Sequence, residues 1–113
     1  MKIELAKKEI IHFIGIGGIG MSGLALIMKA KGFQIQGSDI NKNKNIEKLK
    51  KQGVRIFIGQ KKQNIKDVTI VVTSSAIKKS NPELLEAKRK KLPVIKRGKM
   101  LANLVSLMKN ICL

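Results

Sequence analysis

Near its amino end, the chain has a glycine-rich turn between an apolar run and a helix-like segment. Residues 10–22 read I-I-H-F-I-G-I-G-G-I-G-M-S, with glycines at the spacing Gly15-x-Gly17-x-x-Gly20. Asp39 lies 19 residues after Gly20, at the end of the next apolar stretch. This order of strand, turn, helix, strand and acid is typical of a nucleotide-binding unit whose glycines let the backbone approach a pyrophosphate. The helix behind the turn would offer its unpaired N–H groups and dipole to that anion.

A membrane span is the competing interpretation of the same stretch. Residues 10–28 contain no Lys, Arg, Asp or Glu, and two lysines precede them, so by length they could form a span or a signal-peptide core. Five of these residues are glycine, and His12 lies inside the run. The pattern also continues into a second strand with a matching acid, which a signal peptide does not need. We therefore predict no membrane association and a cytoplasmic protein.

Charge raises the question of nucleic-acid binding. The formal net charge is +17, but 24 basic residues include only three arginines, at positions 55, 89 and 97. Lysines are spread along the whole chain, and no aromatic residues are interleaved for base stacking. Solvated helix faces explain such lysines, so we expect no nucleic-acid partner, although the charge should help anionic ligands approach. The single cysteine, Cys112, excludes an internal disulfide and lies too near the end of the chain to suggest a nucleophile.

Strand and helix patterns alternate through the whole chain. Together they predict one α/β domain over residues 1–113, a Rossmann-like parallel sheet of about five strands with helices on both faces. Apolar or β-branched runs predict strands at 10–14, 33–38, 54–58, 67–73 and 92–96. Apolar residues at helical spacing, with Gly, Asn and Pro as boundary signals, predict helices at 19–31, 43–52, 82–91 and 98–108.

The ligand site of such a sheet lies at the carboxyl ends of its strands. Residues 15–22, 38–39, 59–60 and 73–76 should converge there. Gly17 and Gly18 would allow close approach, and the N–H groups of Ile19 and Gly20 could meet phosphates. Ser22 could donate to a phosphate or cap its helix, and the sequence does not decide between these roles.

Asp39 is expected to accept hydrogen bonds from ribose hydroxyls or a base edge, with a turn or helix cap as the alternative. Ser74 and Ser75 could bind ligand or serve as turn residues. His12 stands mid-strand and faces a helix, which favours a packed core histidine over a catalytic one. The sequence holds no second histidine and no G-x-x-x-x-G-K-[ST] loop, so we predict no catalytic residue and no metal site.

These residues resemble the Mur ligase family of bacterial peptidoglycan synthesis. The likeness begins with H-F-I-G-I-G-G-I-G-M-S-G-L-A at 12–25 and continues through Gly-Ser-Asp at 37–39 and I-F-I-G at 56–59. It resumes with T-S-S-A-I at 73–77, N-P-E at 81–83, P-V-I at 93–95 and Arg97. Within the family, the likeness is to the ligases that join L-alanine to UDP-N-acetylmuramic acid, and the related muramyl-tripeptide ligases share much of the first motif.

The resemblance implies that this chain is the amino-terminal domain, which binds the UDP part of UDP-N-acetylmuramic acid. The glycine loop would lie at the diphosphate, Asp39 near the uridine, and residues 74–76 along the nucleotide. The substrate-binding residues expected on these grounds are Gly17, Gly18, Ile19, Gly20, Met21, Ser22, Ser38, Asp39, Ser74, Ser75, Ala76 and Arg97. Two positions depart from the family pattern: Gln60 stands where a histidine is usual, and Gly98-Lys99 replaces a typical Ala-Glu.

The family's reaction also sets expectations for the rest of the ligase. ATP would activate the muramyl carboxylate as an acyl phosphate, which the amine of L-alanine then attacks. ATP and Mg would be held by a central domain that begins with a G-T-x-G-K-T loop, and a third domain would follow. Both domains would be missing from this chain, which would hold no cofactor and be inactive alone. A stand-alone NAD-binding oxidoreductase or sensor domain is the alternative, motivated by the glycine triplet with Asp39 at ribose-binding spacing.

Overall fold

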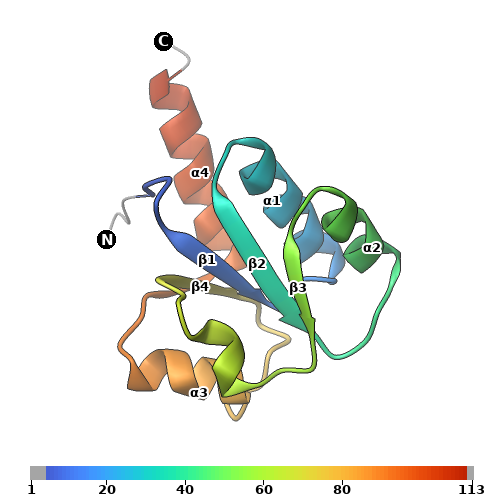
Figure 1. Cartoon of the computed structure of the whole chain (residues 1–113). Coiled ribbons are helices and arrows are strands. Elements are labelled where there is room, and N and C mark those ends of the chain that lie inside the picture. The colour runs from blue at the N-terminus through green and yellow to red at the C-terminus, as the bar shows by residue number, and fades with distance from the viewer. Residues whose placement is uncertain (1–4, 112–113) are drawn as a thin grey trace.

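A computed structural model of the chain describes residues 5–111, with side chains through residue 108. Within this range, strands and helices alternate as the sequence predicted (Figure 1). The elements in chain order are β1 (Ile10–Ile14), α1 (Ile19–Ala30), β2 (Gln34–Asp39), α2 (Lys44–Lys51), β3 (Arg55–Ile58), the 3-10 helix η1 (Lys62–Ile65), β4 (Ile70–Thr73), α3 (Pro82–Arg89), β5 (Val94–Lys96) and α4 (Arg97–Ile111).

The five strands form one parallel sheet in the order β3-β2-β1-β4-β5. The chain lays down β1, β2 and β3 toward one edge and then crosses back to place β4 on the other side of β1. The strand order therefore reverses between β1 and β4, which is where such sheets bind ligands, outside the carboxyl ends of the strands. In register, Phe13 of β1 lies between Gly37 of β2 and Val72 of β4. The predicted Rossmann-like fold is confirmed.

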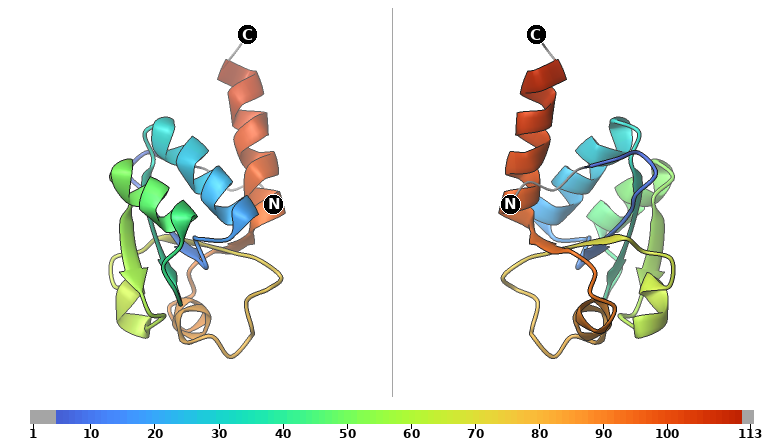
Figure 2. Two further views of the ribbon diagram at one scale, coloured as in Figure 1. Left: turned by 90° about the vertical axis from the view of Figure 1, so that its right-hand side faces the viewer. Right: turned by 90° about the vertical axis from the view of Figure 1, so that its left-hand side faces the viewer.

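Helices cover both faces of the sheet. Helices α1, α2 and α4 pack on one face, and α3 with η1 packs on the other (Figures 1 and 2). The first face holds the larger apolar core, in which Phe13, Met28 and Leu49 are fully buried. The second face holds a smaller cluster around Ile65 and Ala87. Burial on both faces explains why β1 and β4 are mostly apolar and do not alternate with polar residues, as a strand with one solvent-exposed face would.

Some details of the prediction were wrong. β5 begins at Val94 and not at residue 92, and α4 spans Arg97–Ile111 and not 98–108. The strand expected at 67–73 begins only at Ile70, because Asp67 still belongs to the turn that follows η1. Thr69 already lies against β1, where its N–H donates to the Ile10 carbonyl at 2.9 Å. The 3-10 helix itself was not predicted, since four residues carry no helical periodicity. Cys112 lies outside the described residues.

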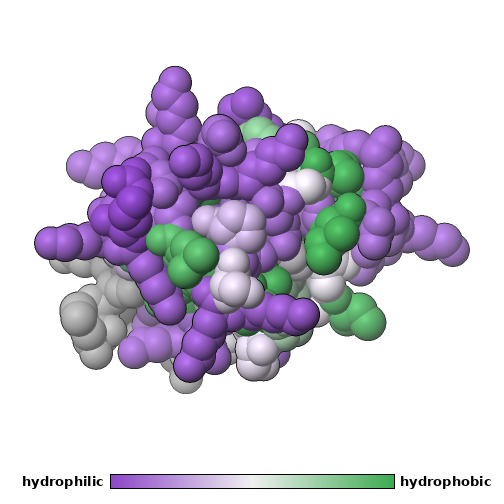
Figure 3. All heavy atoms as spheres, turned by 90° about the horizontal axis from the view of Figure 1, so that it is seen from below, coloured by the Kyte–Doolittle hydropathy of each residue, from purple (hydrophilic) through white to green (hydrophobic). Residues whose placement is uncertain are grey.

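The surface is dominated by hydrophilic side chains. The face seen from below in Figure 3 is mostly hydrophilic, with apolar residues in small separate spots. Isolated apolar residues of this kind are normal on a protein surface. Over the described part of the chain, no helix combines the length and apolar character needed to cross a membrane.

Candidate functional site

The glycine loop between β1 and α1 is held against the end of β2. Gly15 has a φ of +78°, a conformation that L side chains rarely adopt. The N–H groups of Gly15 and Ile16 both donate to the Ser38 carbonyl at 2.9 Å, and the Gly18 N–H donates to the Gly15 carbonyl at 3.1 Å. The loop is thus closed on itself and fastened to β2. Because it directly follows β1, it lies beside the point where strand order reverses.

Asp39 closes the loop from the other side. Its Oδ2 accepts from the Gly17 N–H at 2.8 Å and its Oδ1 from the Ile40 N–H at 2.8 Å. A Cβ on Gly17 would lie 2.8 Å from Asp39 Oδ2, so this approach requires glycine. A carboxylate offers about four lone-pair sites, so Asp39, which is half-buried, keeps accepting capacity for a ligand. The alternative that Asp39 caps α2 is wrong, because Asn43 is the N-cap.

The amino terminus of α1 offers donors that the chain does not use. The first helical N–H groups, those of Ile19, Gly20 and Met21, have no hydrogen-bond partner among the described residues. Gly18 is the N-cap and has no side chain that could satisfy them. Residues 19–22 include no acid, so no internal negative charge occupies this end of the helix dipole.

Arg97, the first residue of α4, lies directly against this turn. A Cβ built on Gly20 would lie 2.9 Å from Arg97 Nε and 3.0 Å from Cζ, so the guanidinium fills the space that glycine leaves. Arg97 is half-buried and makes no hydrogen bond or ion pair within residues 5–108, whose side chains the structure describes. Free N–H groups, a helix dipole and an arginine fork therefore converge on one spot, which is the chemistry of a phosphate site.

Ser22 is buried and does not take the cap role that the sequence allowed. Its hydroxyl donates to the Ile19 carbonyl at 3.1 Å, within its own helix, and only 5% of its surface is exposed. The cap alternative is wrong, since Gly18 occupies that position. A phosphate contact would require the hydroxyl to rotate and stays a prediction. Met21 is likewise buried, at 4% exposure.

The loop after β4 reaches the same edge of the sheet. Ser74, Ser75 and Ala76 form a turn that is closed by the Ile77 N–H donating to the Ser74 carbonyl at 3.2 Å. The hydroxyls of both serines have no partner in the described part of the chain. Ile77 brings this turn to the glycine loop, because its Cδ1 would lie 3.1 Å from a Cβ on Gly15. A hollow of about 360 Å³ opens beside the turn toward α3 and β5.

Ser38 is fully buried, in contrast to the other candidates on this edge. Its hydroxyl donates to Glu83 Oε1 at 2.5 Å, so the side chain points into the protein and supports the loop from within. The same oxygen lies 2.7 Å from His12 Nε2, and Glu83 Oε2 accepts from the Lys61 N–H at 3.1 Å and from Asn64 Nδ2 at 2.7 Å. Glu83 itself is 0% exposed.

His12 is the packed core histidine that the sequence favoured, and its hydrogen bonds define its tautomer. Gln36 Nε2 lies 2.9 Å from His12 Nδ1 and also donates to the Asn64 carbonyl at 2.9 Å. Because an amide nitrogen only donates, Nδ1 accepts and Nε2 carries the proton that is donated to Glu83. Burial acts to raise the pKa of Glu83, but hydrogen bonds from His12, Ser38 and Asn64 outweigh it and hold that pKa below its ordinary value.

Sequence reasoning missed three residues that build the site. Asn43 Nδ2 and Asn45 Nδ2 donate to the Gly17 carbonyl at 3.2 and 2.9 Å, so both anchor the glycine loop to α2. Glu83 stood in a recognised motif without a role. Two asparagines shortly after a strand that ends in an aspartate could have predicted the contacts with Gly17. The partners of Glu83 could not be predicted, because they come from segments that only folding brings together. Gln60, a departure from the family pattern, accepts from Asn81 Nδ2 at 2.7 Å.

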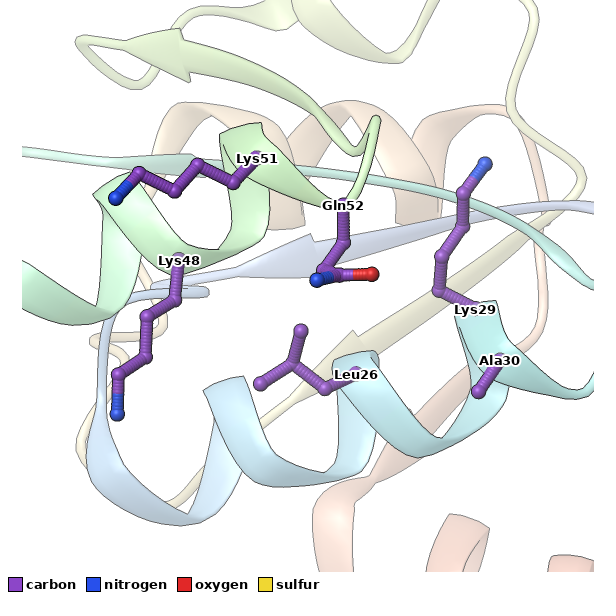
Figure 4. Close-up of a pocket in the computed structure, with 6 residues that line it drawn as sticks. All are labelled: Leu26, Lys29, Ala30, Lys48, Lys51 and Gln52. Carbon is purple, nitrogen blue, oxygen red and sulfur yellow. The ribbon is translucent and has the colours of Figure 1, made fainter.

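A larger hollow lies elsewhere and collects none of the predicted site residues. It measures about 470 Å³ and lies between the second halves of α1 and α2, where Leu26 and Ala30 meet Lys29, Lys48 and Lys51 (Figure 4). This position is remote from the amino terminus of α1. Over the described residues, no three His, Cys, Asp or Glu side chains lie close enough together to hold a metal ion.

Known proteins that are similar to this chain point to one family. The family model described as Mur ligase family, catalytic domain, matches residues 10–109. The UDP-N-acetylmuramate–L-alanine ligase of Pelagibacter ubique (strain HTCC1062) is 70% identical over 111 residues, which cover 98% of this chain and 24% of that protein. The chain thus spans about a quarter of the length of this relative.

Solved structures of such ligases share the fold. The UDP-N-acetylmuramate–alanine ligase of Thermotoga maritima matches with a TM-score of 0.82 and 33% identity, over 86% of this chain and 23% of that one. A second match is the UDP-N-acetylmuramate:L-alanyl-gamma-D-glutamyl-meso-diaminopimelate ligase of Neisseria meningitides. Its TM-score is 0.76 with 27% identity, over 82% of this chain and 30% of that one.

Proposed function

The chain belongs to the Mur ligase family, and on that premise we propose that residues 1–113 form the UDP-binding amino-terminal domain of a UDP-N-acetylmuramate–L-alanine ligase. Its ligand would be UDP-N-acetylmuramic acid. One observation of the structure carries the proposal: the unpaired N–H groups at the start of α1 and the unpaired Arg97 converge on Gly20, among the described residues. This spot suits a diphosphate, which carries negative charge on oxygens that accept several hydrogen bonds.

Each part of the site has a role in this proposal. The N–H groups of Ile19 and Gly20 donate to the diphosphate, while Arg97 neutralises its charge. Asp39, already fixed by Gly17, accepts from the uridine with its remaining lone pairs. Ser74 and Ser75 supply free hydroxyls from the opposite loop. Together these groups bind and orient the UDP end of the substrate, and no residue of this set is proposed to react.

The ligation itself is proposed for a longer protein. An ADP-forming ligase would use ATP and Mg to activate the muramyl carboxylate for attack by L-alanine. The present residues do not fit that cofactor, because the sequence has no glycine-rich loop ending in Lys and Ser or Thr that could hold a triphosphate. We accordingly propose that ATP and Mg bind outside residues 1–113, that this chain alone is inactive, and that the ligase is cytoplasmic.

The related muramyl-tripeptide ligases are a second candidate, since one of their structures matches with a TM-score of 0.76. The 70% identity to an L-alanine ligase favours the first candidate. Both candidates bind a UDP-muramyl ligand through this domain. The choice between them therefore leaves the site proposed here unchanged.

Calorimetric titration of UDP-N-acetylmuramic acid into the purified chain tests the proposal, with UDP and NAD run separately. We expect uptake of the UDP-sugar, weaker uptake of UDP and none of NAD. Uptake of NAD alone would favour the dinucleotide-binding alternative. Absence of any uridine-nucleotide binding by the folded chain would contradict the proposal.

Replacing Arg97 probes the diphosphate contact directly. In Arg97→Ala, a charge-assisted hydrogen-bond donor is lost, so affinity for UDP should fall by roughly tenfold to a hundredfold. Arg97→Lys keeps the charge without the planar guanidinium, so its affinity for UDP should fall less. Arg55→Ala is the matched control: it removes the same charge, but from the amino end of β3, opposite the strand ends that form the site. Equal losses in Arg97→Ala and Arg55→Ala would mean that only net charge matters.

A further inference from the structure

We propose that Glu83 is a positioning residue for the nucleotide site: its buried carboxylate holds the carboxyl ends of β1 and β2 in the arrangement that shapes the glycine loop. The ligand named in the test rests on the function proposed above, whereas the arrangement itself is visible in the structure. Glu83 does not touch the site. It acts through Ser38, the residue to which the loop is fastened.

One carboxylate joins three segments of the chain to α3. Glu83 lies in the first turn of α3, and its four hydrogen-bond donors come from β1, β2 and the segment formed by Lys61 and η1. The contacts are His12 Nε2 and the Ser38 hydroxyl on one oxygen, and the Lys61 N–H and Asn64 Nδ2 on the other. All four carboxylate lone pairs are used, which makes this a fully satisfied buried network.

Ser38 connects this network to the glycine loop. Ser38 donates its hydroxyl to Glu83 and accepts the N–H groups of Gly15 and Ile16 with its carbonyl. The next residue, Asp39, accepts the Gly17 N–H. A shift of Ser38 therefore moves the anchor of three consecutive loop residues. One residue links the buried carboxylate to the loop that is proposed to bind the diphosphate.

The network requires a carboxylate and not merely a side chain of that shape. An amide at position 83 would have one oxygen for four donors, and its NH₂ would face either His12 with Ser38 or Lys61 with Asn64. His12 cannot relieve the conflict by exchanging its proton between nitrogens, because Gln36 already donates to Nδ1. Glu83→Gln, which keeps the size of the side chain, should therefore push the ends of β1 and β2 apart without creating a cavity in the core.

The test compares Glu83→Gln with the wild-type chain in two measurements below the unfolding temperature of both. The first is the calorimetric affinity for UDP-N-acetylmuramic acid, which should weaken about tenfold. The second is the amide NMR spectrum without ligand, in which the resonances of Gly15, Ile16 and Gly17 should shift. Val68→Ala is the control: it weakens the same α3-side core but touches neither Ser38 nor the loop. It should lower stability and leave both measurements unchanged.

The outcomes separate this proposal from the proposed function. Wild-type affinity and unshifted loop amides in Glu83→Gln would overturn the positioning role, and so would equal effects in Val68→Ala. If the wild-type chain binds no uridine nucleotide, the proposed function fails, while the loop amides still decide the role of Glu83. If Glu83→Gln does not fold, Ser38→Ala takes its place, because it breaks only the link to the loop and leaves Glu83 with three donors.

Discussion

At the scale of single residues, the glycine loop depends on a glycine that is not part of it. Gly37 lies in β2 opposite Phe13, and the Ile16 side chain folds directly over it. A Cβ on Gly37 would lie 2.6 Å from the Ile16 Cβ and 2.8 Å from the Phe13 carbonyl oxygen. Neither atom is the end of a flexible side chain, so glycine here reflects close approach of backbone to backbone.

Gly37→Ala should therefore destabilise the fold by about 1–3 kcal/mol, as overpacking of a buried site does. Urea unfolding followed by circular dichroism measures the change. Gly23→Ala is the opposite control: Gly23 lies inside α1 with nothing within 4 Å of a new Cβ, so alanine should stabilise by about 0.5–1 kcal/mol. Unchanged stability in Gly37→Ala would show that β2 and the loop can separate without cost.

At the scale of elements, helix caps connect the helices to the site. Asn43 caps α2 by accepting from the Ile46 N–H at 2.9 Å and also donates to Gly17. Asn81 caps α3 by accepting from the N–H groups of Glu83 and Leu84 at 2.9 and 3.3 Å. Asn43 thus starts a helix and holds the glycine loop at once, whereas Asn81 joins the start of α3 to Gln60, which follows β3.

Asn81→Ala should destabilise the chain by about 1 kcal/mol, because two N–H groups at the start of α3 lose their acceptor. Thermal unfolding detects the loss. Asn81→Asp keeps an acceptor at this position and adds a favourable charge at the helix amino terminus, so it should lose less. An aspartate variant as unstable as the alanine variant would show that the contact of Asn81 with Gln60, not the cap, is what stabilises α3.

At the scale of the whole molecule, a chain of net charge +17 keeps a buried carboxylate charged. The pKa of Glu83 lies below its ordinary value of 4.5 because hydrogen bonds, first that of His12, outweigh the opposing effect of burial. A lowered folded-state pKa means that the unfolded chain takes up the proton first. This contribution to stability is complete above the ordinary pKa and is lost as pH falls through the lowered one.

We expect the free energy of unfolding of the wild-type chain to fall from pH 6 toward pH 3, and that of Glu83→Gln to fall less steeply. Urea unfolding across this range gives both slopes. Glu86, whose pKa is lowered by its hydrogen bond with Arg89, is unchanged by the substitution and should contribute equally in both proteins. Parallel pH profiles would mean that Glu83 is not the group whose protonation weakens the fold.

Much of the candidate site was predictable because its residues form a motif of a few adjacent positions. Gly15 allows the backbone to turn, and Gly17 and Gly20 allow the side chains of Asp39 and Arg97 to approach it closely. Glycines required for these reasons recur at a fixed spacing that can be read from the sequence. Boundaries were less certain, as the late start of β4 shows, because β-branched residues mark a strand without marking its first hydrogen bond. The role of Ser22 could not be predicted, since a serine in a first helical turn has several acceptors within reach.

The sequence by itself determined the alternation of strands and helices, the parallel sheet, the glycine loop and the acid that faces it, because these follow from local periodicity and backbone conformation. Only the tertiary structure decided that Arg97 lies against Gly20 and that Glu83 collects His12, Ser38 and Asn64. The physical reason is distance along the chain. His12 and Glu83 are 71 residues apart, and a buried carboxylate takes its donors from whatever segments the strand order brings beside it.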